Sequence, residues 1–527
     1  MVTAHNPVMR GMNPDPSIVR VGEEYFAATS TFEWFPGVRL HRSRNLAHWE
    51  TVGHALDSRQ CMTLEGVPDS GGVWAPSLSY ADGRFWLVYS VVHTMDGDDL
   101  DAKNYLTTAE GIEGPWDEPV FLGSRGFDFS LAHLDGRHWA VGVQWDQRPD
   151  HPSFAGIVLE EYLPAERRMA GRPLLIASSS ELVEGPNLYH HDGWYYLLLA
   201  EGGTGWNHGI TVARARDIRG PYEFDPAEAL LTTRDAPGHP LQKAGHGELV
   251  QTPSGDWMLV HLASRPILAH GERYSPLGRE TCIQAVEFTD DSWLRLVGGG
   301  WHPALTLDLD LPESHPPLPA ERDDFDDPAL DYLWWSTLRR PLSADEADLM
   351  SRPGWLRLRG GSSPGSVFGQ SMIARPPTEH HSMITALIDA EPSTTRQSAG
   401  VVAWYNRDSH CALLVCWDAE NGRHARVVDR DRRTRFSEPI PLPTGPVRLR
   451  LALDDQRITF AVAARTGPWH DTGIERDAWR LSDDHGGGLR FTGIHLGVRA
   501  EDLDGTGWSA DIDYVDIVSE AGPWARS

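Results

Sequence analysis

The chain has few cysteines, no long apolar run and a deficit of basic side chains. Its four cysteines form no CxxC pair and no Cys/His cluster with zinc spacing, which argues against a zinc finger and, in so large a chain, against a disulfide framework. No run of about 18 apolar residues occurs, and the N-terminal residues lack the apolar segment of a signal peptide. We therefore expect a cytoplasmic protein that does not span a membrane.

Charge and motifs exclude several classes of function. The chain carries 47 basic and 75 acidic side chains, a net charge of −28, which argues against nucleic acid or an anionic membrane surface as the main partner. A small neutral ligand is favoured instead. The sequence contains no phosphate-binding P-loop, dinucleotide fingerprint, HExxH motif or serine nucleophile elbow, so we expect no required cofactor.

One sequence pattern recurs five times in the first 300 residues, where helical periodicity is scarce. Each copy is a short apolar strand, a glycine turn and an aromatic-rich strand, as in "PSLSYADGRFWLVYS" and "PNLYHHDGWYYLLLAEGG". The turn glycines are Gly22, Gly83, Gly136, Gly193 and Gly255, at spacings of 61, 53, 57 and 62 residues. Such a unit holds about four strands with their connections. Five units in succession predict a five-bladed β-propeller.

Aligning the five first strands reveals a set of residues in the same phase. One to three residues ahead of the shared position stand Asp15, Trp74, Asp128, Glu184 and His246. In a propeller the first strands of all blades line the central channel and start at one end of it. We expect these five residues to meet at one mouth. Taken singly, Asp15 before proline is typical of a turn and His246 of a buried polar residue, but the shared phase favours a site.

Two carboxyl groups facing each other across a pocket are what cleavage of a glycosidic bond requires. One protonates the leaving oxygen, and the other activates water or attacks carbon. A third carboxylate beside the acid would raise its pKa. We expect Asp128 to keep Glu184 protonated in this way while Asp15 stays ionised.

Aromatic and basic residues near the acids are candidate pocket residues. Phe32, Trp74 and Phe127 lie close to the acids in sequence, although each could instead be hydrophobic core. Arg279, in a glycine-flanked segment near the last blade, could clamp sugar hydroxyls or hold a carboxylate ionised, whereas a surface arginine is the plainer alternative.

These motifs together resemble glycoside hydrolase family 43, and within it the two-domain β-xylosidases. The resemblance rests on "NPVMRGMNPDPSIVRVGEEYFAATSTFEWFPGVRL", "GVPDSGGVWAPSLSY", "GFDFSLAHLDG", "EGPNLYHHDGWYYLLLAEGGTG", "QKAGHGELVQT" and "PLGRET", and it covers essentially the whole chain. It implies an all-β, inverting hydrolase: a five-bladed propeller over residues 1–305, a linker over 306–321 and a concanavalin-like β-sandwich over 322–527. The linker region is rich in proline and acidic residues, and short alternating strands follow it.

The resemblance also implies roles for the site residues. Asp15 would be the general base, Glu184 the general acid and Asp128 the group that tunes the acid's pKa and orients substrate. The family's substrate-pocket positions match Phe32, Trp74, Phe127 and Arg279. His246 matches a histidine on the channel axis that lies beside a bound water or a divalent cation such as calcium. Asn187 and Met12 depart from the family's usual histidine and phenylalanine.

The second domain contributes one candidate residue. In relatives a loop of the sandwich closes one side of the pocket, and we expect the segment "EDLDGTGWSADIDY" to be that loop, with Trp508 as a wall residue. By the same resemblance the chain could form a homo-oligomer.

The expected function is that of an exo-acting β-1,4-xylosidase, which removes one xylose from the non-reducing end of small neutral xylo-oligosaccharides with inversion. Inversion requires the two carboxyl groups to lie about 6.5–9.5 Å apart. The sequence leaves open an α-L-arabinofuranosidase or a dual enzyme. A rival of another class is a glycan-binding propeller without catalytic activity.

Overall fold

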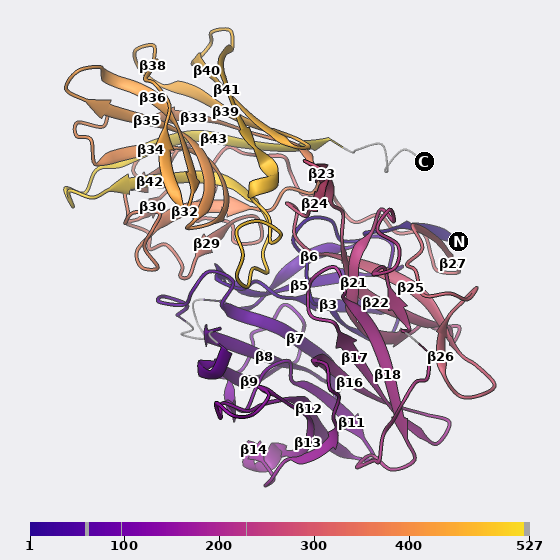
Figure 1. Ribbon diagram of the computed structural model, residues 1–527. Helices are drawn as coiled ribbons and strands as arrows, with labels where there is room; N and C mark the ends of the chain where they lie inside the picture. The colour runs from indigo at the N-terminus through magenta and orange to yellow at the C-terminus, as the bar shows by residue number, and fades with distance from the viewer. Residues whose placement is uncertain (58–62, 96, 228, 521–527) are drawn as a thin grey trace.

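The expected all-β fold is confirmed by the computed structural model, which describes residues 1–57, 63–95, 97–227 and 229–520 (Figure 1). Within these ranges the chain forms β-strands, short 3-10 helices at Gly97–Asp99, Pro164–Glu166 and Ala478–Arg480, and no α-helix. No helix in this part of the chain is long and apolar enough to cross a membrane. The cysteines in it, Cys282, Cys411 and Cys416, form no disulfide, and Cys61 lies outside the described residues.

Five antiparallel sheets make up the first domain. The first two hold β2 (Ser17–Val21), β3 (Glu24–Thr29), β5 (Gly37–Ser43) and β6 (Glu50–Leu56), then β7 (Gly72–Ala81), β8 (Arg84–Thr94), β9 (Asp101–Ala109) and β10 (Val120–Gly123). The third holds β11 (Ser130–Leu134), β12 (Arg137–Trp145), β13 (Phe154–Leu163), β14 (Arg168–Met169) and β15 (Leu174–Ala177). The last two hold β16 (Val183–His191), β17 (Trp194–Glu201), β18 (Gly209–Ala215), β19 (Glu223–Phe224) and β20 (Leu231–Thr232), then β21 (Gln242–Gln251), β22 (Trp257–Ser264), β25 (Glu280–Phe288) and β26 (Leu294–Leu296).

The sheets are the blades of a closed propeller. The first strands β2, β7, β11, β16 and β21 each contact the next in order, and β21 contacts β2, which completes the ring. The Asp-Gly hairpin turns predicted from the sequence are present in three blades. Asp82 and Gly83, for example, both have positive φ, of 54° and 74°, which a two-residue type I′ turn requires. These turns fix the phase of the first strands and therefore the ring.

The N-terminal strand β1 (Val2–His5) pairs with β27 (Thr306–Leu309) beside the last blade. Residues 306–309 were expected in the linker, so this strand corrects that prediction. The alternating leucines of "ALTLDLDLP" explain it, because Leu309 and Leu311 are buried against the propeller.

The second domain is a sandwich of two antiparallel sheets. One holds β28 (Arg322–Asp323), β30 (Ala347–Asp348), β31 (Leu356–Arg359), β33 (His381–Asp389), β39 (Val447–Asp454), β40 (Arg457–Ala464), β41 (His470–Asp477) and β43 (Ser509–Glu520). The other holds β29 (Ser336–Leu338), β32 (Ser371–Arg375), β34 (Gln397–Asn406), β35 (Ser409–Asp418), β36 (Gly422–Asp431), β37 (Arg433–Phe436), β38 (Ile440–Pro441) and β42 (His495–Asp502).

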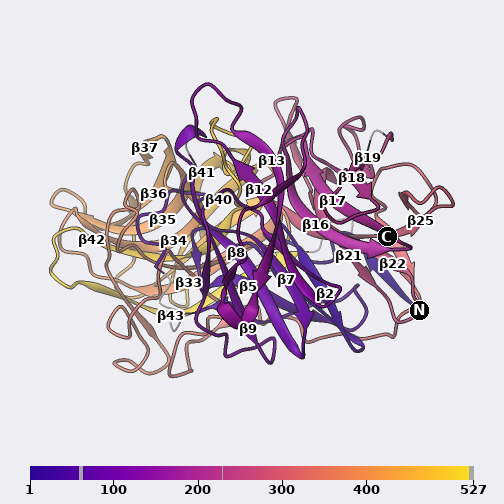
Figure 2. The same ribbon diagram turned by 90° about the horizontal axis from the view of Figure 1, so that it is seen from below.

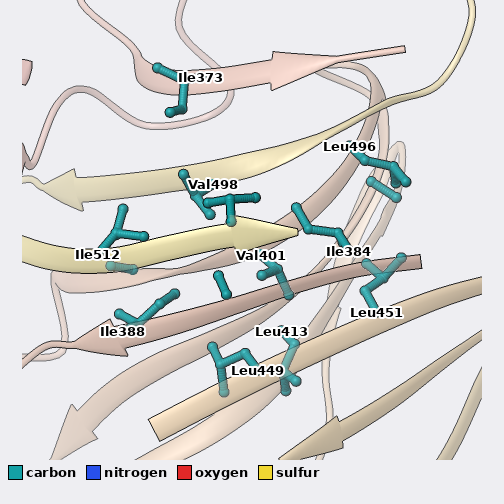
Figure 3. Packing of buried hydrophobic residues seen from close by; sticks show 14 of the residues in the cluster. Ile373, Ile384, Ile388, Val401, Leu413, Leu449, Leu451, Leu496, Val498 and Ile512 are labelled. Atoms are coloured by element: carbon teal, nitrogen blue, oxygen red, sulfur yellow. The ribbon is translucent and has the colours of Figure 1, made fainter. Parts of the chain in front are cut away.

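Alternating side chains build the sandwich core. In β39 the sequence "VRLRLALD" buries every second residue, so one face of the strand is apolar and the other carries arginines. Figure 3 shows the result: Ile384 and Leu449 of one sheet lie against Val401 and Leu413 of the other.

The two domains lie side by side (Figure 1, Figure 2). One sheet contains strands of both domains. Strand β4 (Trp34–Phe35), which belongs to the first blade's sequence, pairs with β29 and so extends a sandwich sheet. Trp34 is 1% exposed and stacks on His495 of the sandwich at 3.9 Å between ring centroids. One apolar cluster therefore spans both domains, and it includes Phe32 and Trp404.

A buried charge cluster holds a sandwich loop against the propeller. The ammonium group of Lys243, in β21, lies 3.0 Å from the Asp483 carboxylate and 2.7 Å from that of Asp484, and the three side chains are 2%, 7% and 9% exposed. Burial and the Asp483 charge raise the pKa of Asp484 to about 6. The loop that follows, residues 485–491, reaches the propeller mouth.

We predict that Lys243→Met destabilises the protein by about 3–5 kcal/mol near pH 8, because it leaves buried carboxylates without their cation. Without Lys243 the pKa of Asp484 rises further above the value of an unfolded chain. The stability defect should therefore grow as pH rises and shrink toward pH 5, where Asp484 is protonated.

Denaturant or thermal unfolding at both pH values measures the effect. The matched control is Lys103→Met, since Lys103 pairs with Asp101 at 3.7 Å in a solvent-exposed position. Equal defects at the two pH values, or equal defects in the two variants, would contradict the role assigned to this cluster.

Candidate active site

A cavity of about 230 Å³ opens at the mouth of the propeller channel and is walled by both domains. Its lining combines three carboxylic acids, one arginine and one histidine with mostly apolar side chains: Asp15, Phe32, Trp74, Ala75, Met95, Gly97, Leu100, Phe127, Asp128, Trp145, Leu182, Glu184, Gly203, Thr204, His246, Arg279, Leu489 and Phe491.

The predicted ring of five residues meets in this cavity. Asp15, Trp74, Asp128, Glu184 and His246 all line it, one from each blade. Their unequal sequence offsets have a structural reason. The pairing of β7, β16 and β21 with their second strands shifts register beside Trp74, Glu184 and His246. Bulges of this kind change the direction of the side chains beside them.

Several site residues have a backbone conformation that most residues avoid. Asp15, Phe32, Asp128 and His246 have φ of 52°, 52°, 53° and 39°, in the left-handed region. Residues held in this region cluster at functional sites, because the surrounding fold must compensate their strain. Here the conformation places each side chain at the channel mouth, and no pattern in the sequence indicated it.

The carboxylate of Asp15 is held ionised. Burial alone would raise its pKa, but the Arg279 guanidinium, His246 and the Ser30 hydroxyl together lower it below the ordinary value. Arg279 donates to Oδ1 at 2.5 Å and Ser30 donates to Oδ2 at 2.7 Å. Both oxygens therefore accept a hydrogen bond, and the carboxylate has a fixed orientation.

Glu184 and Asp128 are biased toward the protonated form. Burial and the negative charge of Asp15 raise the pKa of Glu184 to about 7. The pKa of Asp128 is raised well above its ordinary range by burial, then by Glu184 and Asp15. The pKa of Glu184 is raised, as expected, but the negative charge that contributes to the rise belongs to Asp15 and not to Asp128. Asp128 accepts a hydrogen bond from the Gly185 N–H at 3.1 Å, which ties it to the neighbouring blade.

His246 lies against Gly185. A Cβ at Gly185, whose φ is 56°, would come within 2.8 Å of the His246 ring, so only glycine fits there. Burial, together with Arg279, lowers the pKa of His246 despite the opposing charge of Asp15, so the imidazole is neutral at neutral pH.

The donor set near His246 does not fit a calcium site made by the protein. Calcium takes about six to eight oxygen ligands. Among the described residues, no three or more His, Cys, Asp or Glu side chains are placed to hold an ion. A cation beside His246 therefore stays a prediction, and we assign it no step.

The sandwich closes one side of the cavity, but not through the predicted residue. Leu489 and Phe491 line it, whereas Trp508 does not. Trp508 packs on the sandwich core and donates from its indole nitrogen to the Glu391 carbonyl at 3.1 Å. The Asp502 carboxylate accepts a hydrogen bond from the Trp508 main-chain N–H at 3.0 Å. This bond fixes the turn that carries Trp508, which does not line the cavity. The glycine run Gly486–Gly487–Gly488 was the available signal for the loop that does reach the pocket.

Phe491 is fixed by the propeller. Its main-chain N–H donates to Ser70 Oγ at 3.0 Å, and its carbonyl accepts from Arg279 at 3.2 Å. Its ring packs edge-on against Trp74, 5.3 Å between centroids. Arg279 therefore contacts both Asp15 and the sandwich loop.

Other lining residues were not singled out from the sequence, among them Trp145, Met95 and Leu100. Trp145 ends the second strand of the third blade, where an aromatic residue is ordinary, so nothing in the pattern distinguished it. The predicted Phe32, Phe127 and Arg279 do line the cavity.

The geometry combines an ionised carboxylate with a carboxyl group that holds a proton near neutral pH, inside one small, largely apolar cavity. Such a pair can take a proton from water and give one to a leaving oxygen. Flat aromatic walls suit the faces of a sugar ring.

Comparison with known proteins agrees with this chemistry. Residues 4–294 match the family model "Glycosyl hydrolases family 43", and residues 322–518 match "Beta xylosidase C-terminal Concanavalin A-like domain". A crystal structure of xylan β-1,4-xylosidase from Bacillus halodurans C-125 superimposes with a TM-score of 0.94 at 43% identity, over 98% of this chain and 99% of the other.

Two curated proteins are similar over nearly their whole length. The β-xylosidase of Bacillus subtilis is 40% identical over 97% of this chain and 98% of its own. Xylosidase/arabinosidase 43B of Humicola insolens is 42% identical over 98% of this chain and 97% of its own. The match of both domains over most of the sequence establishes that the chain is a member of glycoside hydrolase family 43 and therefore an enzyme.

Proposed function

We propose that this hydrolase is an exo-acting β-xylosidase that releases xylose from the non-reducing end of β-1,4-xylo-oligosaccharides with inversion. The observation that carries the proposal is the pairing of an ionised Asp15 with a proton-bearing Glu184 in one small cavity. Relatives named as β-xylosidases, at 40% and 43% identity, support xylose as the sugar.

In the proposed mechanism Asp15 is the general base. Its carboxylate removes a proton from water as the water oxygen attacks the anomeric carbon from the face opposite the leaving group. Arg279 and Ser30 fix both carboxylate oxygens, so one orientation is kept ready.

Glu184 is the proposed general acid. It donates its proton to the glycosidic oxygen as the bond to the anomeric carbon breaks, so the leaving sugar departs as a neutral alcohol. Asp128 holds Gly185, the residue next to the acid, and so positions Glu184. After one turnover Asp15 carries a proton taken from the attacking water, Glu184 has lost its proton to the leaving sugar, and exchange with solvent restores both.

A second activity, on α-L-arabinofuranosides, is favoured by one observation. The Humicola relative at 42% identity is named xylosidase/arabinosidase, and a Bacteroides ovatus relative at 32% identity is named a non-reducing end α-L-arabinofuranosidase. The rival reading of a glycan-binding propeller without activity is not supported, because the chain belongs to a hydrolase family and keeps its three acids. Location in the cytoplasm and assembly into a homo-oligomer stay predictions.

The product identifies the reaction. We predict that the protein converts xylobiose to xylose, and that proton NMR in the first minutes of p-nitrophenyl β-xyloside hydrolysis shows α-xylose before mutarotation, because inversion of a β-linkage yields the α-sugar. Rates on p-nitrophenyl β-xyloside and p-nitrophenyl α-L-arabinofuranoside rank the two activities. Initial release of β-xylose would contradict the single-displacement mechanism. A higher rate on the α-L-arabinofuranoside than on the β-xyloside would reverse the ranking of the two activities.

Glu184→Gln should lower kcat on xylobiose by about 10²–10⁴-fold, since it removes the proton donor. The loss should be much smaller on 2,4-dinitrophenyl β-xyloside, whose leaving group departs without protonation. The control is Glu181→Gln, which changes an exposed carboxylate three positions away. A uniform loss on both substrates would show that Glu184 is not the acid.

The pH profile of kcat/KM should fall on the alkaline side as pH passes about 7, where Glu184 loses its proton. On the acid side it should fall only below the ordinary carboxyl range, because the pKa of Asp15 is lowered.

Arg279 lowers the pKa of both groups, so Arg279→Met should move both limbs to higher pH. Arg137→Met, at an exposed ion pair with Glu161, should leave the profile unchanged, and an unmoved acid limb in Arg279→Met would refute the assignment of Asp15.

A further inference from the structure

The side chain of Glu33 is a buried carboxyl group that does not line the cavity and takes no part in the proposed mechanism. Glu33 is 0% exposed and stands between Phe32, which lines the cavity, and β4, which pairs with the sandwich. Its main-chain carbonyl accepts a hydrogen bond from the N–H of Arg339 in the sandwich at 2.8 Å. Glu33 therefore lies where the cavity wall meets the contact between the domains.

The carboxyl group of Glu33 fixes a strained residue. Its Oε2 accepts a hydrogen bond from the Ser70 main-chain N–H at 3.0 Å. Ser70 is buried and has a φ of 63°, in the left-handed region that residues other than glycine rarely adopt. Such a conformation persists only where the surrounding contacts enforce it. The hydrogen bond from Ser70 to Glu33 is one of those contacts.

Ser70 in turn holds two aromatic walls of the cavity. Its carbonyl accepts a hydrogen bond from the Trp74 indole nitrogen at 2.8 Å, and its Oγ accepts one from the Phe491 main-chain N–H at 3.0 Å. Trp74 belongs to the propeller and Phe491 to the sandwich, and both line the cavity. A displacement of Ser70 would therefore move cavity walls that come from both domains.

The surroundings of Glu33 favour its neutral form. Its Oε1 is buried and has no hydrogen-bond partner among the described residues, a situation that disfavours an ionised carboxylate. Burial, then the negative charge of Asp69, raises the pKa of Glu33 to about 8, although the positive charge of Arg339 opposes the rise. A neutral carboxyl group keeps an oxygen acceptor for the Ser70 N–H, and the side-chain amide of glutamine offers the same acceptor.

The nearby charges are paired without Glu33. The carboxylate of Asp69 accepts hydrogen bonds from Arg339 at 2.7 Å and from Arg407 at 3.0 Å, and both arginines belong to the sandwich. The junction between the domains thus has its own ion pairs. The remaining distinctive contact of the Glu33 carboxyl group is its bond with Ser70.

We infer that Glu33 is a positioning residue for the hydrolysis, which acts through Ser70 to hold Trp74 and Phe491 where they contact the sugar. The inference rests on the proposed function, because the sugar between these walls is taken to be the reacting xylose. It assigns a task to a carboxyl group that never contacts the substrate.

The test measures kcat and KM on p-nitrophenyl β-xyloside per folded enzyme. Glu33→Met keeps the side-chain length and removes the oxygen acceptor. It should lower kcat/KM by about tenfold, the scale of one lost hydrogen bond, mainly by raising KM. Glu33→Gln should restore kcat/KM to near the wild-type value. The matched control is Glu379→Met, which removes another buried carboxylate between the domains, bound to Arg265 at 2.6 Å, and should leave KM unchanged.

Ser70→Ala removes the acceptor for the Phe491 N–H and keeps the main chain of Ser70. It should also raise KM, so an unchanged KM in this variant overturns the inference even if Glu33→Met does not fold. In the double variant the loss of kcat/KM should be smaller than the product of the two single losses, because both act on the same contact.

Losses that multiply fully in the double variant, or a Glu33→Gln variant as impaired as Glu33→Met, would overturn the inference. A Glu33→Met variant that is less stable but has unchanged KM would do the same, since it would show a structural role alone. If the wild type does not hydrolyse the β-xyloside, the proposed function is refuted. The same variants compared on p-nitrophenyl α-L-arabinofuranoside then test the positioning role separately.

Discussion

The guanidinium group of Arg279 connects the charge state of the site to the contact between the domains. One of its nitrogens donates to the carboxylate of Asp15 in the propeller, and another donates to the main-chain carbonyl of Phe491 in the sandwich. Because the side chain is 3% exposed, solvent hardly screens its charge, which lowers the pKa of Asp15, Asp128 and Glu184 alike. The ionised base and the position of the pocket wall therefore depend on one buried cation.

Three carboxyl groups in one buried ring can function only if they do not all ionise. The charge stays on Asp15, which has Arg279 beside it, while burial and mutual repulsion raise the pKa of Asp128 and Glu184. Hydrolysis then moves one proton from Glu184 to Asp15 by way of the reactants, so the net charge of the ring is the same before and after the chemical step. A site with constant charge needs little rearrangement around it during reaction.

The sequence was sufficient to predict the propeller and the ring, because both follow from local rules. Glycine turns, of the Asp-Gly kind in three blades, set the phase of each hairpin, and a closed propeller brings residues in the same phase together. The left-handed backbone at Asp15 and Asp128 and the bulge after Glu184 depend on the surrounding fold and left no local pattern. The wall residue from the sandwich was assigned to Trp508 and is Phe491, since a loop's reach across a domain boundary depends on anchors such as Lys243 that are distant in sequence. The strand at residues 306–309 was not predicted, because the region around it has the proline-rich and acidic composition typical of linkers.

Strand β4 has a consequence for how the protein is made. Trp34 and Phe35 leave the ribosome long before Ser336–Leu338, the segment with which they pair. Until translation reaches β29, the nascent first blade presents an unpaired strand edge and the face of an indole that is 1% exposed in the finished molecule. Unpaired edges and uncovered aromatics are the features by which incomplete chains associate with one another. Once it is translated, the sandwich covers a surface that the catalytic domain cannot cover by itself.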